Sequence, residues 1–99
     1  MTTRALVVVV SRFHPAPGCR EGLRVAIAEV AELTAAAGGC YGARACESDQ
    51  DRDALVCVSR WESDDAREAF ENSSAATAGR DRCAHFLAQP AAEERFRPY

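Results

Sequence analysis

The sequence of 99 residues has no lysine, only one tryptophan and one methionine, and no long apolar run. Its twelve basic residues are all arginine, and they are scattered rather than gathered into a basic face, which argues against a nucleic-acid partner. A membrane span needs about 20 apolar residues, and the run Leu6–Val10 is too short even for a signal peptide. We therefore expect a soluble, cytoplasmic protein that binds neither nucleic acid nor a membrane.

The chain also lacks the cysteine spacings that indicate disulfides or zinc. Its five cysteines are odd in number and contain no CxxC motif, so we expect reduced thiols and no metal site. With 47% hydrophobic residues, 27% charged residues and a formal net charge of −3, the composition is that of a folded protein. The length suits one domain that spans residues 1–99.

Four segments have the character of strands. Residues 5–13 (ALVVVVSRF) and 54–61 (ALVCVSRW) are rich in valine and almost continuously apolar, which indicates strands buried on both faces. Residues 40–47 form a weaker strand, which should pair with residues 54–61 as a hairpin across a polar turn. The tail 91–99 contains a short last strand that suits a sheet edge.

Helical patterns fill the gaps between these strands. The first helix should have Gly18 as its N-cap and end at Gly38–Gly39. Its apolar face recurs at spacings of four, three and four residues, at Leu23, Ile27, Val30 and Thr34. Ser63 should cap a second helical region, which a polar break at residues 72–74 interrupts and which resumes from about Ala75 to Leu87.

The element order β-α-β-β-α-β predicts an α+β, ferredoxin-like fold. Such a fold has an antiparallel four-stranded sheet with its helices on one face. The first and third strands look apolar on both sides, so the face without helices should pack against a second copy. The expected assembly is a homodimer in which the two sheets form an α/β barrel.

Three segments of the chain, in this order, resemble the antibiotic biosynthesis monooxygenase family of dimeric ferredoxin-like α/β barrels. They are VVVSRFHPAPG, AGGCYGARACES and VCVSRWESDDAREAF. They are similar to the family's opening strand with its Pro-Gly turn, its second strand, and its helix start after Trp-x-Ser. The resemblance implies cofactor-independent oxygenation of an anthrone- or quinol-type aromatic, haem degradation, or the handling of small signalling metabolites, and the fold alone does not choose among these.

Residues at the family's site positions narrow the choice. Trp61 matches the tryptophan that lines the pocket of the anthrone oxygenases, whereas Cys57 stands where those enzymes have Asn. The quinol-oxidising members have histidines where Phe70 and Ala75 stand. The haem-degrading members have an iron-ligating histidine where Arg80 stands, unless His85 substitutes for it from the next turn, so the resemblance favours oxygenation without a cofactor.

Strand alternation brings further residues to the same site. Ser11 should share a face with Val9 and Phe13, and Ser59 should share one with Cys57 and Trp61. Facing the helices, these residues would line an apolar slot suited to a small, flat aromatic ligand. The candidate substrate-binding residues are Ser11, Cys57, Ser59, Phe70 and Arg80, and the candidate catalytic residues are Trp61, Arg82 and His85.

The expected reaction uses dioxygen and no cofactor, because the substrate supplies the electrons. Trp61 and Phe70 would hold the aromatic ring. Arg82 would hold the anion, and His85 or bulk water would take the proton. Two alternatives stay open: these side chains are ordinary core and surface residues, and the chain is a non-catalytic dimeric barrel that binds a small hydrophobic metabolite.

Overall fold

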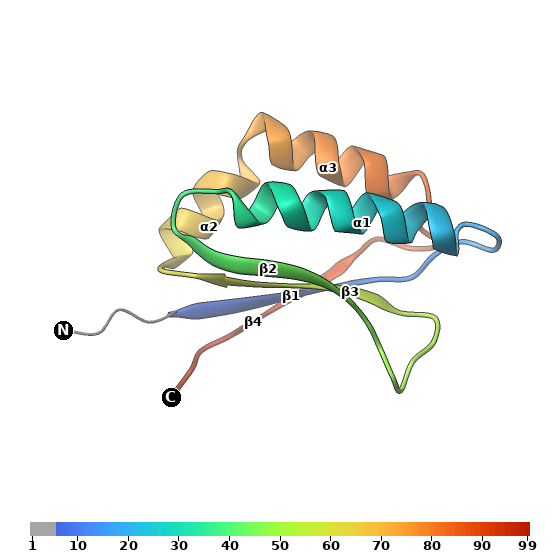
Figure 1. Cartoon of the computed structure of the whole chain (residues 1–99), viewed down its shortest axis with the longest axis horizontal. Helices are drawn as coiled ribbons and strands as arrows, with labels where there is room; N and C mark the ends of the chain where they lie inside the picture. The colour runs from blue at the N-terminus through green and yellow to red at the C-terminus, as the bar shows by residue number, and fades with distance from the viewer. Residues whose placement is uncertain (1–5) are drawn as a thin grey trace.

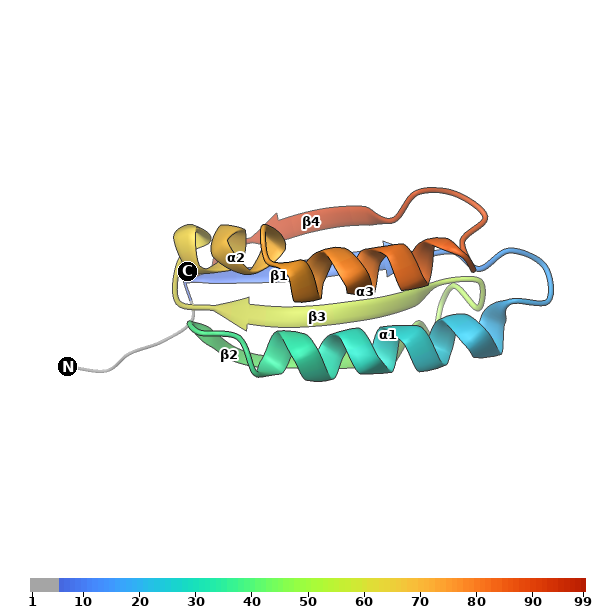
Figure 2. The ribbon, with the colours of Figure 1, turned by 90° about the horizontal axis from the view of Figure 1, so that it is seen from above.

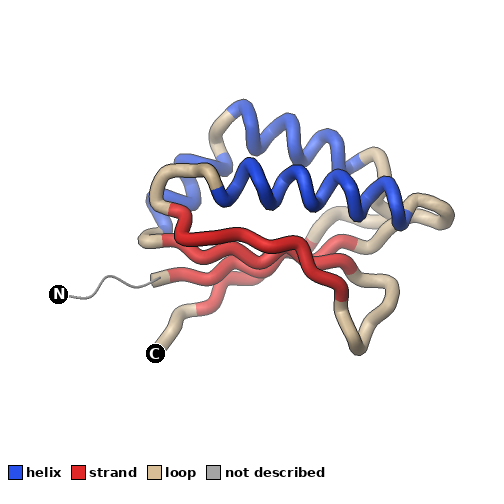
Figure 3. Tube along the Cα trace, viewed as in Figure 1, coloured by secondary structure: helices blue, strands red, loops and turns tan. Residues whose placement is uncertain are grey.

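The computed structural model describes residues 6–99, in which one four-stranded sheet lies beneath a layer of three helices (Figures 1 and 3). The elements in chain order are β1 (Val7–Phe13), α1 (Arg20–Ala35), β2 (Cys40–Glu47), β3 (Leu55–Trp61), α2 (Asp64–Glu71), α3 (Ser74–Ala84) and β4 (Ala92–Phe96). The expected α+β, ferredoxin-like order is confirmed. The predicted first residue of the first strand, Ala5, lies outside the described residues.

The strands run in the order β2-β3-β1-β4, and every neighbouring pair is antiparallel. The predicted hairpin of β2 with β3 is confirmed, and β4 lies at the edge beside β1. Seen from above, α1 and α3 run side by side along the strands, and α2 lies at one end of the sheet (Figure 2). None of the helices in residues 6–99 is both long and apolar enough to cross a membrane.

Serine caps explain why the second helical region is two helices. Ser63 is the N-cap of α2, and its Oγ accepts a hydrogen bond of 3.1 Å from the backbone N–H of Ala66, as predicted. Ser73 repeats this arrangement for α3 with Ala76 at 3.2 Å. Because an N-cap residue is not itself helical, Ser73 ends one helix and starts the next in a new direction.

The start of α1 differs from the sequence prediction by one residue. Gly18 was expected as the N-cap, but Cys19 occupies that position and makes no side-chain cap. Gly18 instead has a φ of +77°, a left-handed conformation that glycine adopts without strain, in the turn before the helix. The predicted apolar face is confirmed, since Leu23, Ile27 and Thr34 are buried and the fourth residue, Val30, is half-buried against the core.

The strand register places the predicted site residues on the face that meets the helices. Val9 pairs with Ser59, and Ser11 pairs with Cys57. Because side chains alternate along a strand, these residues and Trp61 all point toward the helical layer. The sequence expectation that Ser11 shares a face with Val9 and Ser59 shares one with Trp61 is therefore confirmed.

The core consists of two clusters along this face. One lies under α1 and α3 and contains Leu23, Ala26, Ile27, Ala31, Leu55, Cys57 and Cys83. The other lies at the α2 end, where Val7, Val9 and Trp61 are completely buried. Ala37, Cys40, Ala66 and Phe70 pack against this second cluster. The α2 end of the molecule thus combines the largest buried side chain, Trp61, with the aromatic Phe70.

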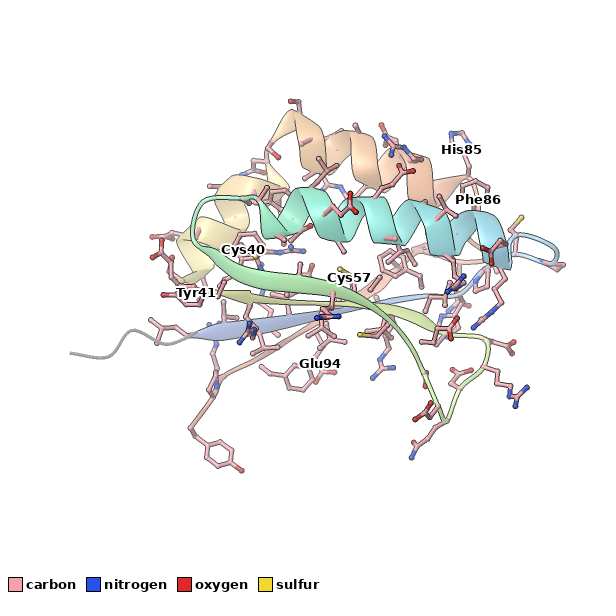
Figure 4. All side chains as sticks on the ribbon, viewed as in Figure 1. Cys40, Tyr41, Cys57, His85, Phe86 and Glu94 are labelled. Atoms are coloured by element: carbon pink, nitrogen blue, oxygen red, sulfur yellow. The ribbon has the colours of Figure 1, made fainter. Side chains whose placement is uncertain are left out.

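The opposite face of the sheet has no helix over it in residues 6–99 (Figure 1). Val8, Val10 and Val58 point to this side, where each is half-buried, and Phe96 of β4 is 43% exposed. Glu94 pairs with Val10, and its side chain lies on the same side, below the sheet in Figure 4. The apolar stripe of Val8, Val10, Val58 and Phe96 is named the outer face below.

Candidate functional site

Trp61 is the anchor of the α2 end of the core. Its ring is 0% exposed, and its Nε1 donates a hydrogen bond of 2.8 Å to Oγ of Ser59, which is itself buried. The ring centroid lies 5.6 Å from that of Phe70, and the two planes are tilted by 36°. The Ser59 hydroxyl therefore satisfies the indole N–H and fixes the tryptophan as the rigid back wall behind Phe70.

An apolar hollow opens in front of this wall, between the end of α1 and the helices α2 and α3. It has a volume of about 390 Å³, within the range of small-ligand pockets. We call it the Phe70 groove, and it is lined by Leu33, Ala36, Ala37, Gly38, Ala66, Ala69, Phe70, Ser73 and Ala75. Ala37, Ala66 and Phe70 also pack against the core cluster that contains Trp61, so the groove lies directly beside this cluster.

The Phe70 groove offers a ligand almost no free polar group. Ser73 is its one hydroxyl, and this Oγ donates to the carbonyl oxygen of Phe70 at 2.6 Å while accepting from the N–H of Ala76. Gly39, next to the lining residue Gly38, lets the backbone approach α2 closely, because it has a φ of +79° and an added Cβ would lie 2.6 Å from Cβ of Ala66. The groove is therefore suited to an apolar ring.

Sequence reasoning missed Arg67, a charged residue of α2 that lies over the Trp61 and Phe70 rings without lining the groove. Its guanidinium carbon is 5.4 Å from the Trp61 ring centroid and 5.9 Å from that of Phe70, within the range of cation–π contacts. The side chain is only 11% exposed. The four-residue spacing of Arg67 and Glu71 on α2 is a sequence signal for their ion pair, but no signal places Arg67 over Trp61.

Arg67 is held by carboxylates from two elements. Its Nε donates to Oε1 of Glu71 at 2.7 Å, and an Nη donates to Oε1 of Glu93 on β4, also at 2.7 Å. Arg95 lies alongside, 3.4 Å from Glu71 and 3.6 Å from Glu93. These four residues, which we call the Arg67 network, join α2 to the edge strand and balance two positive charges with two negative ones.

The Arg67 network continues toward the start of α2 through Asp64. Arg95 donates to Oδ1 of Asp64 at 2.8 Å, and Arg97 approaches Oδ2 at 3.0 Å. The hydrogen bond from Arg97, followed by that from Arg95, lowers the pKa of Asp64. An ionised Asp64 also suits the first turn of α2, where the helix dipole favours negative charge.

Cys57 lies between the sheet and the helical layer (Figure 4). Its thiol is free, as are those of the other four cysteines. Burial raises the pKa of this thiol to about 11, although the charge of Arg67 acts in the opposite direction. The thiol is therefore protonated at neutral pH and unreactive, as a small buried side chain in the core. Ser11, its partner on β1, is half-buried beside it.

Arg82 and His85 lie at the far end of the helical layer. Arg82 is exposed on α3 and forms an ion pair with Glu29 of α1. His85 is the exposed C-cap of α3, and its ring points away from the sheet (Figure 4). Cys40, which pairs with Trp61, lies at the opposite end of the molecule in the same view. One chain therefore does not bring Arg82 or His85 to Trp61.

Arg80 has a local structural contact. Its Nη donates to the carbonyl oxygen of Glu71 at 3.1 Å and to Oγ1 of Thr77 at 3.3 Å, so it covers the C-terminal end of α2. A further hollow of about 290 Å³ lies between α1 and β2 and contains none of the predicted site residues. Within residues 6–99, no three His, Cys, Asp or Glu side chains gather as a metal site requires.

The sequence model of the family described as antibiotic biosynthesis monooxygenase matches residues 6–82. The solved structure of Rv0793 from Mycobacterium tuberculosis has 28% sequence identity and a TM-score of 0.84, and the match covers 94% of each chain. None of the curated proteins matches the sequence.

Two more distant structures share the fold. A candidate antibiotic biosynthesis monooxygenase from Bordetella bronchiseptica has a TM-score of 0.83 at 18% identity, over 97% of this chain and 99% of that one. Another, from Deinococcus radiodurans, has a TM-score of 0.85 at 14% identity, over 95% of this chain and 93% of that one. These likenesses concern the backbone arrangement and not the residues of the site.

Proposed function

This chain belongs to the antibiotic biosynthesis monooxygenase family, and we propose that it oxidises a small, electron-rich aromatic compound of the anthrone or quinol type with dioxygen and without a cofactor. The observation that carries the proposal is the Phe70 groove with Trp61 behind it. A groove lined by alanines and one aromatic ring favours a flat, apolar substrate over a polar one.

In this reaction the protein binds and shields while the substrate supplies the electrons. Loss of a proton from the substrate gives an anion, which passes one electron to dioxygen. The resulting radical pair recombines to form a carbon–oxygen bond. The peroxide anion takes up a proton and then loses water to leave a quinone. One oxygen atom enters the product and the other leaves as water. Phe70 contacts the substrate ring, and Trp61 holds Phe70 in place from behind.

The proton that leaves the substrate and the anion that remains each need a partner. The sequence assigns the anion to Arg82 and the proton to His85 or bulk water. With His85 exposed at the other end of α3, bulk water is the acceptor that the arrangement favours. Ser11, Cys57 and Ser59 shape the buried side of the site beneath the helices.

Haem degradation fits these residues poorly. The family position of the iron ligand is Arg80, whose guanidinium is engaged with Glu71 and Thr77. His85 would have to act as a substitute, and it lies on the outer side of α3. We therefore do not assign haem as a cofactor or a substrate.

A homodimer is part of the proposal. The outer face offers a stripe of valines and an exposed Phe96, and covering it against a second copy would remove this apolar surface from water. Light scattering of the purified protein should give twice the chain mass. Replacing Val10 by aspartate should give the mass of one chain, because a charge at the centre of the stripe opposes burial; a monomeric parent would overturn this part.

A second candidate function is supported by one observation. The Phe70 groove has no free polar group, because both hydrogen-bonding roles of Ser73 are occupied. Such a site can bind an apolar metabolite without acting on it. The chain would then be a non-catalytic barrel, and ligand binding without oxygen uptake would be the sign of it.

The test is oxygen consumption by metal-free protein with a panel of anthrones and dihydroxynaphthalenes, against a blank without protein. Ala69→Leu narrows the groove at an exposed position, and Ala78→Leu adds the same side chain to an exposed position of α3 outside it. We expect uptake well above the blank, loss of most of it in Ala69→Leu, and full uptake in Ala78→Leu. Equal uptake in both variants would overturn the assignment of the groove. Binding of the panel without uptake would replace the oxygenase by the binding protein.

A further inference from the structure

We propose that Arg67 is the anion-binding residue of the site and that an aromatic ligand bearing an anionic oxygen binds it by displacing Glu93. The inference rests on the proposed function and deepens it, because it specifies the charge of the ligand. It starts from the position of one guanidinium, which lies over both aromatic rings of the site.

Arg67 is an unusual residue to find at this place. Burying a guanidinium whose side chain is only 11% exposed is costly unless carboxylates compensate its charge, and Glu71 and Glu93 do so. The two partners are not equivalent. Glu71 is on the same helix, four residues away, and remains beside Arg67 whenever α2 is folded. Glu93 comes from the edge strand and is 35% exposed.

The edge-strand partner is the exchangeable one. If Glu93 releases the Nη of Arg67, its carboxylate keeps a second cation nearby, since Arg95 Nε is 3.6 Å from its other oxygen. Displacement therefore does not leave Glu93 without a positive neighbour. The freed Nη of Arg67 can then donate to a phenolate or carboxylate oxygen of a ligand, as guanidinium groups do.

The position of Phe70 connects this exchange to the groove. Phe70 lines the Phe70 groove, and the same ring lies 5.9 Å from the Arg67 guanidinium. Arg67 does not itself line the groove, so Phe70 is the side chain that joins the two, and an anionic oxygen must extend past the Phe70 ring to reach the guanidinium. A neutral apolar ligand gains nothing from that charge, whereas an aromatic anion does. The site should therefore prefer anionic aromatics to uncharged ones of the same shape.

Titration calorimetry with 1-naphthoate and the uncharged 1-naphthylmethanol measures this preference directly. We expect the parent to bind naphthoate more tightly. Glu93→Gln should lower the Kd of naphthoate by roughly two- to fivefold, because a competing carboxylate is removed. The Kd of naphthylmethanol should not change. Arg67→Gln should weaken naphthoate by about tenfold and abolish the preference.

Two further variants separate the role of the Arg67 charge from that of its geometry and provide a control. Arg67→Lys retains the charge without the planar fork and should keep part of the preference, which a merely structural role of Arg67 would not predict. Arg24→Gln removes an exposed arginine of α1 that pairs with Glu47, and it should leave both affinities unchanged. A preference that survives Arg67→Gln, or a naphthoate affinity insensitive to Glu93→Gln, would overturn the inference.

The experiments distinguish a wrong role for Arg67 from a wrong oxygenase assignment. The calorimetric preference needs no turnover, so it can hold in a protein that consumes no oxygen. Conversely, oxygen uptake that depends on Ala69 with no preference for the anion would leave the oxygenase assignment intact and refute only the role of Arg67. Absence of binding by both compounds would also refute that role.

Discussion

The buried thiol of Cys57 should make the protein less stable at alkaline pH by a predictable amount. Burial raises its pKa from 9.0 to about 11 in the folded state. Between these two values the unfolded chain loses the proton and the folded chain keeps it. The folded state then binds more protons than the unfolded state, so stability falls as pH rises. Below about pH 9 both states are protonated and this contribution is fully present.

The size of the effect follows from the two pKa values. They differ by about two pH units, and one unit corresponds to about 1.4 kcal/mol. Because half of the folded thiols are still protonated at pH 11, Cys57 should account for a loss of about 2 kcal/mol of unfolding free energy between pH 8 and pH 11. This is a substantial part of the roughly 5 to 15 kcal/mol that stabilise an ordinary domain.

The assay is urea unfolding at several pH values, at one protein concentration and with a reducing agent. The single tryptophan, Trp61, is fully buried, so its fluorescence reports unfolding. Cys57→Ala should be less stable than the parent at pH 8 because of the small cavity, and the difference should shrink or reverse by pH 11. Cys46→Ala, at an exposed position, should keep the pH dependence of the parent. Parallel curves for the parent and Cys57→Ala would refute the argument.

Two further predictions concern the frame around the site. Gly39→Ala should lower the free energy of unfolding by more than about 2 kcal/mol, because alanine is strained at a φ of +79° and its Cβ would lie 2.6 Å from Cβ of Ala66. Gly38→Ala, with open space around the added Cβ, should stay within about 0.5 kcal/mol of the parent. Urea unfolding measures both values. Ser63→Ala should lose about 1 kcal/mol of unfolding free energy, because it removes the side-chain N-cap of α2. Ser74→Ala, at an exposed position beside the α3 cap, should leave the stability nearly unchanged. Equal thermal midpoints for the two serine variants would contradict the capping argument.

Local sequence was enough to predict the start of α2 and the two central strands. Ser63 precedes two aspartates, which is enough to place a helix start without knowledge of the fold. Continuous β-branched segments likewise located β1 and β3 to within one or two residues. Once the element order was known, the antiparallel sheet with its helices on one face followed from the few topologies that such an order allows.

For the candidate site, the sequence predicted the faces of the strand residues correctly but not the positions of Arg82 and His85. The period of two along β3 placed Cys57, Ser59 and Trp61 on one face, because alternation is a property of the strand itself. The same reasoning could not place Arg82 and His85, since the direction of a helical side chain depends on how the helix packs. The turn at Ser73 and the packing of α3 on α1 decide that: Arg82 pairs with Glu29 of α1. His85 lies at the opposite end of the molecule from Cys40, the partner of Trp61 in the sheet.

The sequence by itself determined the secondary structure and the faces of the strands, because these depend on neighbours within a few residues. Tertiary structure alone decided that Arg67 lies over Trp61 and that Glu93, 26 residues away, is its partner. An arginine on a helix is usually solvated, and nothing in its local sequence marks it otherwise. Its burial arises only when β4 closes the edge of the sheet beside α2, a contact between segments that local propensities do not encode.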